Sequence, residues 1–177
     1  MSFQEHEKQH IEKNVKRKLT DTELQILAAE WSEHCSYKSS KKHLRMLPTT
    51  GPNVIVEKGY DSGVLDVGDG FVVTVHIESH NHPSAVEPFG GAATGVGGVI
   101  RDILSAGTRP IALFDGLRFG NIENDAHARW LFKNAVSGIA DYGNCLGIPT
   151  IGGEVEFDEC YKNYALVDVA AVGFGKK

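Results

Sequence analysis

The sequence predicts a mixed α/β domain of the α+β class, and three observations support this. Segments with strand periodicity alternate along the chain with segments of helical periodicity. Apolar residues make up 41% of the 177 residues, which is enough to form a core. The chain has 20 glycines, where an average share of about 7% gives roughly 12, and five of them fall between positions 90 and 98.

The chain is expected to hold a charged N-terminal segment, residues 1–18, followed by one domain, residues 19–177. Within the segment, residues 5–18 are charged and nearly devoid of apolar side chains. They are therefore interpreted as a solvated helix, a linker or a frayed tail, and these alternatives stay open.

A first helix of the domain is predicted from about residue 21 to 32. Thr20 and Glu23 have the spacing of a capping box, and apolar side chains then recur at helical spacing. The polar run 33–38 follows, so its side chains lie at a helix end, where they can point into a cleft.

Two strands are expected at residues 53–57 and 70–78. In the second strand, apolar side chains alternate with polar ones: Val73, Val75 and Ile77 against Thr74, His76 and Glu78. Pro83 disfavours helical backbone at His82, so residues 79–84 are predicted to form a loop at the carboxyl end of this strand.

The glycines between positions 90 and 98 are interpreted as a glycine-rich loop that opens a helix ending at Gly107. This helix carries an apolar stripe, formed by Val96, Val99, Ile100, Ile103 and Leu104. Further along, the pattern predicts a strand at 110–117, a helix at 124–142, and two more strands at 150–157 and 166–174.

Several functional classes are disfavoured by composition. The net charge of −5 provides no strong basic field for nucleic acid or an anionic membrane. No run of 18 apolar residues is present, and the N-terminus is charged, so transmembrane and secreted interpretations are disfavoured. Three scattered cysteines, Cys35, Cys145 and Cys160, argue against a disulfide framework or a structural zinc site and favour a cytoplasmic location.

The densest group of reactive side chains lies at the carboxyl end of the strand at 70–78 and just beyond it, and comprises His76, Glu78, His80, Asn81 and His82. Alternate residues of an extended chain face the same way, so Glu78, His80 and His82 are expected to converge on one pocket. A carboxylate suits a hard cation, and imidazoles transfer protons near neutral pH. Alternatively, these histidines are solvated, or one of them caps the next helix, and the residues alone leave both readings open.

The glycine-rich segment is a second candidate site. Backbone amides at a helix start form an anion site, and Arg101 and Asp102 suit a phosphate and a metal ion respectively. One face of this helix is small or polar, and it consists of Thr94, Gly98, Arg101 and Ser105. The alternative is a close helix–sheet contact that needs glycines, with an exposed Arg–Asp pair. No Rossmann or P-loop pattern is present.

Two further residues were considered as catalytic groups. Cys145 lies in a GxCxG sequence like that of a nucleophile elbow, but a helix precedes it and a strand follows, which reverses the order that such an elbow requires. Cys145 is therefore interpreted as a core residue at a helix end. Glu154 follows two glycines in a strand and is either a functional acid or a paired charge.

Four ordered motifs resemble one known family. They are EHCSYK at 33–38, ESHNHPS at 78–84, PFGGAATGVGGVIRDILSAGTRPIAL at 88–113 and PTIGGEVEFD at 149–158. In these motifs the chain is similar to the large, synthetase subunit of phosphoribosylformylglycinamidine synthase. The resemblance implies the N-terminal sheet-plus-helices domain of the aminoimidazole ribonucleotide synthetase-like superfamily, which pairs with a second copy through its sheet.

The resemblance also implies roles for individual residues. His34 and His80 correspond to active-site histidines, with His80 as the proton acceptor. Tyr37 and His76 stand at ATP-contacting positions, although the family pattern has a lysine where this chain has His76. Glu78 and Asp102 correspond to magnesium ligands. The substrate contacts correspond to Ser79, His80, Asn81, His82 and Arg101.

The implied reaction is an ATP- and Mg²⁺-dependent ligation in purine biosynthesis. Formylglycinamide ribonucleotide and glutamine-derived ammonia become formylglycinamidine ribonucleotide through an iminophosphate. The implied partners are a glutaminase subunit, a small bridging subunit and the remainder of a longer synthetase chain. The chain is expected to be the N-terminal domain of the first half of that synthetase, inactive alone and homodimeric through its sheet.

Three alternative functions remain open at this point. One is another ATP-using member of the same superfamily, which the His-Asn-His-Pro segment disfavours. Another is a metal-dependent hydrolase built on Glu78, His80 and His82. The last is a non-catalytic regulator that binds nucleotides.

Overall fold

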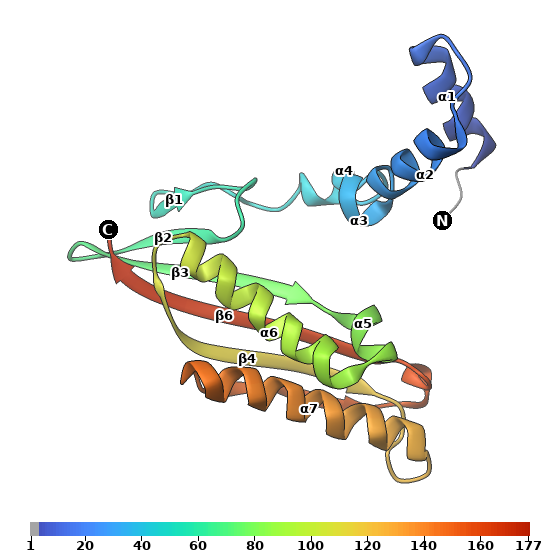
Figure 1. The fold of residues 1–177 in the computed structure, drawn as a ribbon. Helices are drawn as coiled ribbons and strands as arrows, with labels where there is room; N and C mark the ends of the chain where they lie inside the picture. The colour runs from blue at the N-terminus through green and yellow to red at the C-terminus, as the bar shows by residue number, and fades with distance from the viewer. Residues whose placement is uncertain (1–3) are drawn as a thin grey trace. The chain divides into compact units, whose positions relative to one another are not determined.

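The computed structural model describes residues 4–177, which form two compact units divided between Pro48 and Thr49 (Figure 1). The boundary expected after residue 18 lies inside the first unit, and residues 1–3 of the charged segment lie outside the described residues. Within residues 4–177, no helix combines the length and the apolar character needed to span a lipid bilayer.

The described part of the first unit, residues 4–48, holds four helices: α1 Glu5–Val15, α2 Asp21–Glu30, α3 Glu33–Ser36 and α4 Lys41–Leu44. Of the alternatives for the charged segment, the helix is therefore correct. The capping box is confirmed, because the Glu23 amide donates to the Thr20 hydroxyl while the Glu23 carboxylate accepts from the Thr20 amide. Ion pairs from Arg17 to Glu23 (2.5 Å) and from Lys38 to Glu7 (2.6 Å) connect the charged segment to the helices after it.

The second unit is built on one six-stranded sheet in the order β1-β2-β3-β6-β4-β5. Its strands are β1 Val54–Val56, β2 Gly63–Gly68, β3 Phe71–Ser79, β4 Arg109–Phe119, β5 Thr150–Phe157 and β6 Ala165–Lys176. Only the pairing of β4 with β5 is parallel. The mixed sheet confirms the predicted fold class. Strand β2 was not predicted; it pairs with β3 through a tight turn at Asp69 and Gly70.

Two long helices, α6 Pro88–Ser105 and α7 Ala126–Leu146, cover one face of this sheet (Figure 1). A short 3-10 turn, η1 Glu159–Tyr161, precedes β6. The core lies between the helices and the sheet, where Val96, Val99 and Ile103 of α6 are fully buried. The predicted apolar stripe is thus confirmed apart from Leu104, which is 56% exposed.

Residues 79–84 do not form the predicted loop. A short helix, α5 Asn81–Val86, begins directly after β3 and includes both His82 and Pro83. Pro83 is its third residue, and the first turn of a helix has backbone N–H groups without intrahelical partners, so a proline is tolerated there. The expectation failed because it treated Pro83 as a helix breaker rather than as a first-turn residue.

The glycines between 90 and 98 also differ from expectation, since they lie within α6 rather than in a loop before it. Packing explains them. A Cβ at Gly91 would lie 2.5 Å from the backbone nitrogen of Ser84, and a Cβ at Gly95 would lie 3.1 Å from the Cβ of His80. Real Cβ atoms do not approach backbone as closely as 2.5 Å, so Gly91 allows α5 to contact α6 directly. Gly95 leaves room for the side chain of His80, which links β3 to α5.

The contact between α6 and α7 depends on a glycine in the same way. A Cβ at Gly138 would overlap the carbonyl oxygen of Phe89, which belongs to the backbone and cannot rotate away. In a free helix, alanine is favoured over glycine by about 1 kcal/mol. At position 138 the steric overlap should outweigh this preference for alanine. We therefore expect Gly138→Ala to lower the free energy of unfolding by about 1–3 kcal/mol.

Urea unfolding measures this effect, with the exposed neighbour Ser137→Ala as the control on the same helix. The control should change the free energy of unfolding by less than about 0.5 kcal/mol. A Gly138→Ala protein as stable as the parent would show that the two helices do not make this close contact.

Candidate active site

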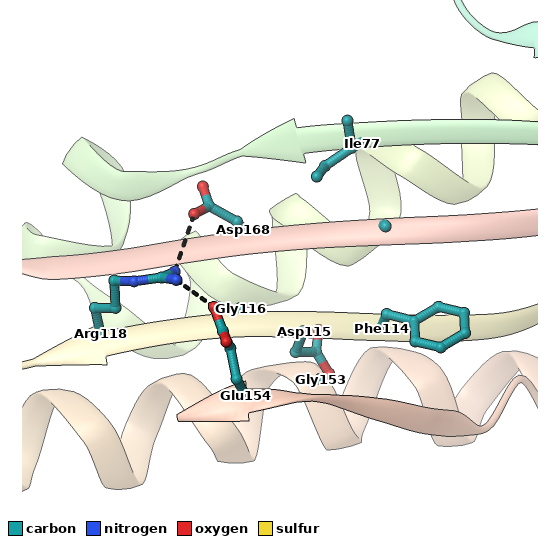
Figure 2. Close-up of a pocket in the computed structure, with 9 residues that line it drawn as sticks. Ile77, Phe114, Asp115, Gly116, Arg118, Gly153, Glu154 and Asp168 are labelled. Atoms are coloured by element: carbon teal, nitrogen blue, oxygen red, sulfur yellow. Dashed lines mark hydrogen bonds and ion pairs between the residues drawn. The ribbon is translucent and has the colours of Figure 1, made fainter. Parts of the chain in front are cut away.

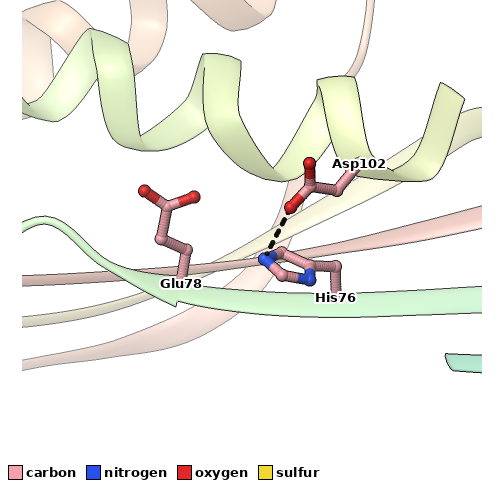
Figure 3. A group of neighbouring side chains, drawn as sticks. All are labelled: His76, Glu78 and Asp102. Atoms are coloured by element: carbon pink, nitrogen blue, oxygen red, sulfur yellow. Dashed lines mark ion pairs between the residues drawn. The ribbon is translucent and has the colours of Figure 1, made fainter. Parts of the chain in front are cut away.

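The candidate site lies where the carboxyl end of β3 faces α6. His76, Glu78 and Asp102 each offer one ligand atom, and these atoms all lie within 4.8 Å of one another. Figure 3 shows the two β3 side chains reaching toward the helix and Asp102 reaching back toward the strand. The Nε2 atom of His76 lies 3.1 Å from Oδ2 of Asp102. The structure therefore brings together Glu78 and Asp102, the two residues predicted to bind metal.

This arrangement depends on the lack of a side chain at Gly98. A Cβ there would overlap the carboxylate of Glu78, so any larger residue would displace either the helix or the acid. The α6 backbone beside the cluster is held by Ser62, whose hydroxyl donates to the carbonyl oxygen of Asp102 at 2.9 Å. The close helix–sheet contact that was one interpretation of the glycine-rich segment is therefore present.

His80 extends the cluster on the side of α5. Its Nδ1 atom lies 3.1 Å from Oε1 of Glu78, and both side chains are partly buried. A carboxylate can only accept, so Nδ1 is assigned as the protonated nitrogen in this contact. In a neutral ring, Nε2 is then left with its lone pair available as a base.

His82 does not join Glu78 and His80 as expected. Because α5 begins at Asn81, the strand alternation ends before His82, and its Nδ1 instead meets the hydroxyl of Tyr164 at 2.8 Å. The side-chain Oδ1 of Asn81 accepts from the backbone amide of Val167 at 2.7 Å. Neither Tyr164 nor Val167 was foreseen, since both lie more than 80 residues away in sequence.

The remaining second-unit candidates have different surroundings. Ser79 stands opposite Asp168 in the ladder between β3 and β6. Arg101 is exposed and makes no ion pair within residues 4–177, while its neighbour Asp102 pairs with His76. The alternative of an exposed Arg–Asp pair is therefore wrong.

The start of α6 does not provide the predicted anion site. The carboxylate of Glu87 accepts from the Gly90 amide at 2.6 Å, so a negative group from the chain itself already caps this helix. Cys145 also departs from expectation, because it is exposed in the last turn of α7 rather than part of the core.

His34 and Tyr37 belong to the first unit, where Glu33 organises the loop after α3. The Glu33 carboxylate accepts from the Ser39 amide (2.8 Å), the Ser40 amide (2.9 Å) and the Ser40 hydroxyl (2.5 Å). These hydrogen bonds lower the pKa of Glu33 to about 2. Tyr37 ends α3 with a left-handed φ of 51°, and its side chain is 53% exposed.

A second hollow, of about 440 Å³, lies on the sheet face opposite α6 and α7 (Figure 2). Arg118 is its central cation, with ion pairs to Glu154, to Glu156 at 3.0 Å and to Asp168 at 3.8 Å. Burial raises the pKa of Asp168 and outweighs the Arg118 guanidinium, which acts to lower it. Glu154, left open by the sequence, is thus a paired charge.

Comparison with known proteins identifies two matching families. Residues 59–174 match the family described as AIR synthase related protein, N-terminal domain, and residues 1–38 match the formylglycinamide ribonucleotide amidotransferase linker domain.

Curated relatives include the same enzyme subunit from two organisms. Phosphoribosylformylglycinamidine synthase subunit PurL of Caldanaerobacter subterraneus is 58% identical over 156 residues, or 88% of this chain and 21% of that protein. The PurL subunit of Nitratiruptor is 51% identical over 173 residues, or 96% of this chain and 24% of that protein. The chain therefore spans about a quarter of the length of these relatives.

Solved structures show the same similarity. T. maritima PurL complexed with ATP matches with a TM-score of 0.81 and 42% identity, over 98% of this chain and 27% of that chain. The same protein complexed with FGAR also gives a TM-score of 0.81 and 42% identity, over 98% of this chain and 26% of that chain. AaThiL complexed with AMPPCP and TMP has a TM-score of 0.59 over 84% of this chain and 44% of that chain, and at 14% identity it shows likeness of fold alone.

The Glu33 contacts generate a prediction about pH. The pKa of Glu33 is lowered from its usual 4.5 to about 2, so its stabilising effect on the loop is present above pH 4.5 and is lost as the pH falls toward 2. NMR titration should show the Ser39 and Ser40 amides shifting together with the Glu33 carboxyl.

Glu33→Gln should give these two amides altered shifts at neutral pH, whereas Glu30→Gln, one turn earlier at the end of α2, should leave them unchanged. Amide shifts that do not follow the Glu33 carboxyl would mean that another group holds the loop.

Proposed function

This chain belongs to the AIR synthase related family, and from this membership and its similarity to PurL subunits we propose that it carries part of the synthetase site of phosphoribosylformylglycinamidine synthase. The observation that supports this most strongly is the cluster of Glu78, His80 and Asp102 between β3 and α6. It joins a cation-binding carboxylate pair to a histidine whose ring is oriented as a base.

The donor set fits a magnesium ion, because two carboxylates converge on one point and hard cations prefer oxygen ligands. Magnesium held by Glu78 and Asp102 would neutralise the charge on the ATP phosphates during transfer. The alternative of a hydrolase with a metal bound by Glu78, His80 and His82 loses support, since His82 bonds to Tyr164 instead.

The proposed reaction has two steps. The amide oxygen of formylglycinamide ribonucleotide attacks the γ-phosphorus of ATP, the bond to ADP breaks, and an iminophosphate forms. Ammonia then attacks the imino carbon and inorganic phosphate leaves. Phosphorylation is needed because an amide oxygen is a poor leaving group.

His80 is assigned to the second step as the proton acceptor for the attacking nitrogen. Its hydrogen bond to Glu78 supports this role, since donation from Nδ1 leaves Nε2 as the acceptor. Glu78 thereby serves both the cation and the base.

The other contacts are proposed from the family resemblance. Tyr37 is assigned to ATP, His76 to ATP through the cation cluster, and His34 to the active site. The substrate contacts are assigned to Ser79, His80, Asn81, His82 and Arg101. Among these, Arg101 offers an exposed guanidinium without an ion pair in residues 4–177, which suits a phosphate.

The complete enzyme is proposed to unite several parts. These are the remainder of a synthetase chain, a glutaminase subunit that supplies ammonia and a small bridging subunit. A cytoplasmic location is proposed from the three cysteines, all of them free and exposed.

The sheet face opposite the helices is proposed to pair with a second sheet, and in the isolated chain with a second copy of itself. Cross-strand register places its apolar side chains together: Leu65, Val75, Ile77, Phe114 and Phe174. Each of these is 38–69% exposed. Such a contiguous apolar face is typical of an interaction surface.

We expect the isolated chain to sediment as a dimer at tens of micromolar. Ile77→Lys should shift it to monomer, because Ile77 is 69% exposed in this apolar face and a buried charge is costly. Ile26→Lys, at a 59% exposed position of α2, is the matched control and should remain dimeric. Sedimentation of the unaltered chain as a monomer would contradict the pairing.

The catalytic assignment predicts different defects for two variants of the complete synthetase. His80→Ala should lower turnover by about 10²–10⁴-fold with little change in nucleotide affinity, because a base is lost. Glu78→Ala should weaken magnesium-dependent nucleotide binding, with partial rescue at higher magnesium, because one ligand is lost.

The measurement is ATP-dependent formation of the amidine with free ammonium, which makes the glutaminase unnecessary. The control variant is Ser137→Ala, on the exposed side of α7, which should keep parental turnover and nucleotide affinity. Parental turnover in His80→Ala would defeat the assignment.

A further inference from the structure

We propose that His76 is a third protein ligand at the cluster with Glu78 and Asp102, and that the site therefore favours transition-metal cations such as Mn²⁺ over Mg²⁺. The proposal rests on the proposed function only in identifying this cluster as the cation site of the enzyme. The new element is a nitrogen donor beside the two carboxylates.

The distances suit a single ion. In a six-coordinate site with bonds of about 2.1–2.2 Å, adjacent ligand atoms lie about 3.0 Å apart and opposite ones about 4.3 Å apart. The Nε2 atom of His76 and Oδ2 of Asp102 are 3.1 Å apart, which fits adjacent ligands. The longest separation among the three donors stays within 4.8 Å, so small side-chain movements bring all three onto one cation.

The surroundings hold the donors in place. All three side chains are half-buried and project from two regular elements, β3 and α6. His80 binds one carboxylate oxygen of Glu78, and Ser62 fixes the backbone at Asp102. Hydrogen bonds to ligands of this kind are typical of metal sites, because they orient the ligand before the ion arrives.

The identity of the third donor determines the preference among cations. Magnesium favours oxygen ligands and retains several waters, so an imidazole adds little to its affinity. Divalent transition metals bind nitrogen ligands more strongly than magnesium does, with Mn²⁺ the weakest of the series and Co²⁺ and Zn²⁺ stronger. His76 should therefore strengthen binding of these ions while leaving magnesium almost unaffected.

The test measures binding of metal alone to the 177-residue chain, without nucleotide. Electron paramagnetic resonance of free Mn²⁺ gives the Mn²⁺ affinity, and competition gives the Mg²⁺ affinity. We expect His76→Gln to weaken Mn²⁺ binding by about 10-fold or more and Mg²⁺ binding by less than about 3-fold. The matched control is His127→Gln. His127 is exposed, stacks on Trp130 and lies 51 residues after His76, so this variant should bind both ions like the parent chain.

A Co²⁺ titration followed by NMR gives an independent readout, since the His76 ring protons should shift strongly while those of His127 should not. The proposal is overturned if His76→Gln binds Mn²⁺ like the parent, or if it weakens Mn²⁺ and Mg²⁺ equally, as loss of the ion pair with Asp102 alone would do. An unchanged amide spectrum of His76→Gln verifies its fold. Because metal binding is measured without nucleotide, it can succeed even if the proposed synthetase function is wrong. Likewise, parental Mn²⁺ binding by His76→Gln would contradict the role of His76 without contradicting the synthetase function.

Discussion

The close approach of α6 to β3 and α5 is the constraint on which the candidate site depends. Gly91, Gly95 and Gly98 recur at spacings of four and three, so they lie on one face of the helix. A Cβ at Gly91 would meet the backbone of α5, one at Gly95 would meet His80, and one at Gly98 would meet the Glu78 carboxylate. The first two glycines let α5 and His80 pack against α6, and the third leaves room for Glu78 beside Asp102, so a larger residue at Gly98 would displace the acid.

Much of the fold is predictable because its signals are local. The buried stripe from Val96 to Ile103 follows from helical periodicity, and the capping box at Thr20 follows from two residues three positions apart. The failures come from residues whose role depends on position within an element. Pro83 disfavours the interior of a helix but is tolerated in its first turn, and the short strand β2 is visible only once β3 is present to pair with it.

The site could be predicted in part for the same reason. The motif at 78–84 and the strand alternation predict Glu78 as a cation-binding residue, and the family resemblance implies Asp102 as a second ligand. The expected contact of His80 with Glu78 is confirmed, and strand alternation places His76 on the same side as Glu78. The expectation is wrong for His82, because the alternation ends at Ser79 and the chain turns into α5, where His82 bonds to Tyr164, a partner 82 residues away. Partner choice over such distances depends on the packed fold and has no local signature in the sequence.

On the sheet face opposite the helices, charged side chains can determine the register in which a second sheet packs, which apolar burial alone would not do. Ile77 and Phe114 border the hollow in which Arg118 meets three carboxylates (Figure 2). Burial of apolar surface is non-directional, so a flat apolar face accepts many registers. A partner that covered these carboxylates without water or a cation would incur a large desolvation cost. Only registers that leave the acids hydrated or bring a basic group to them are compatible with pairing, so the charged cluster selects among the registers that the apolar face permits.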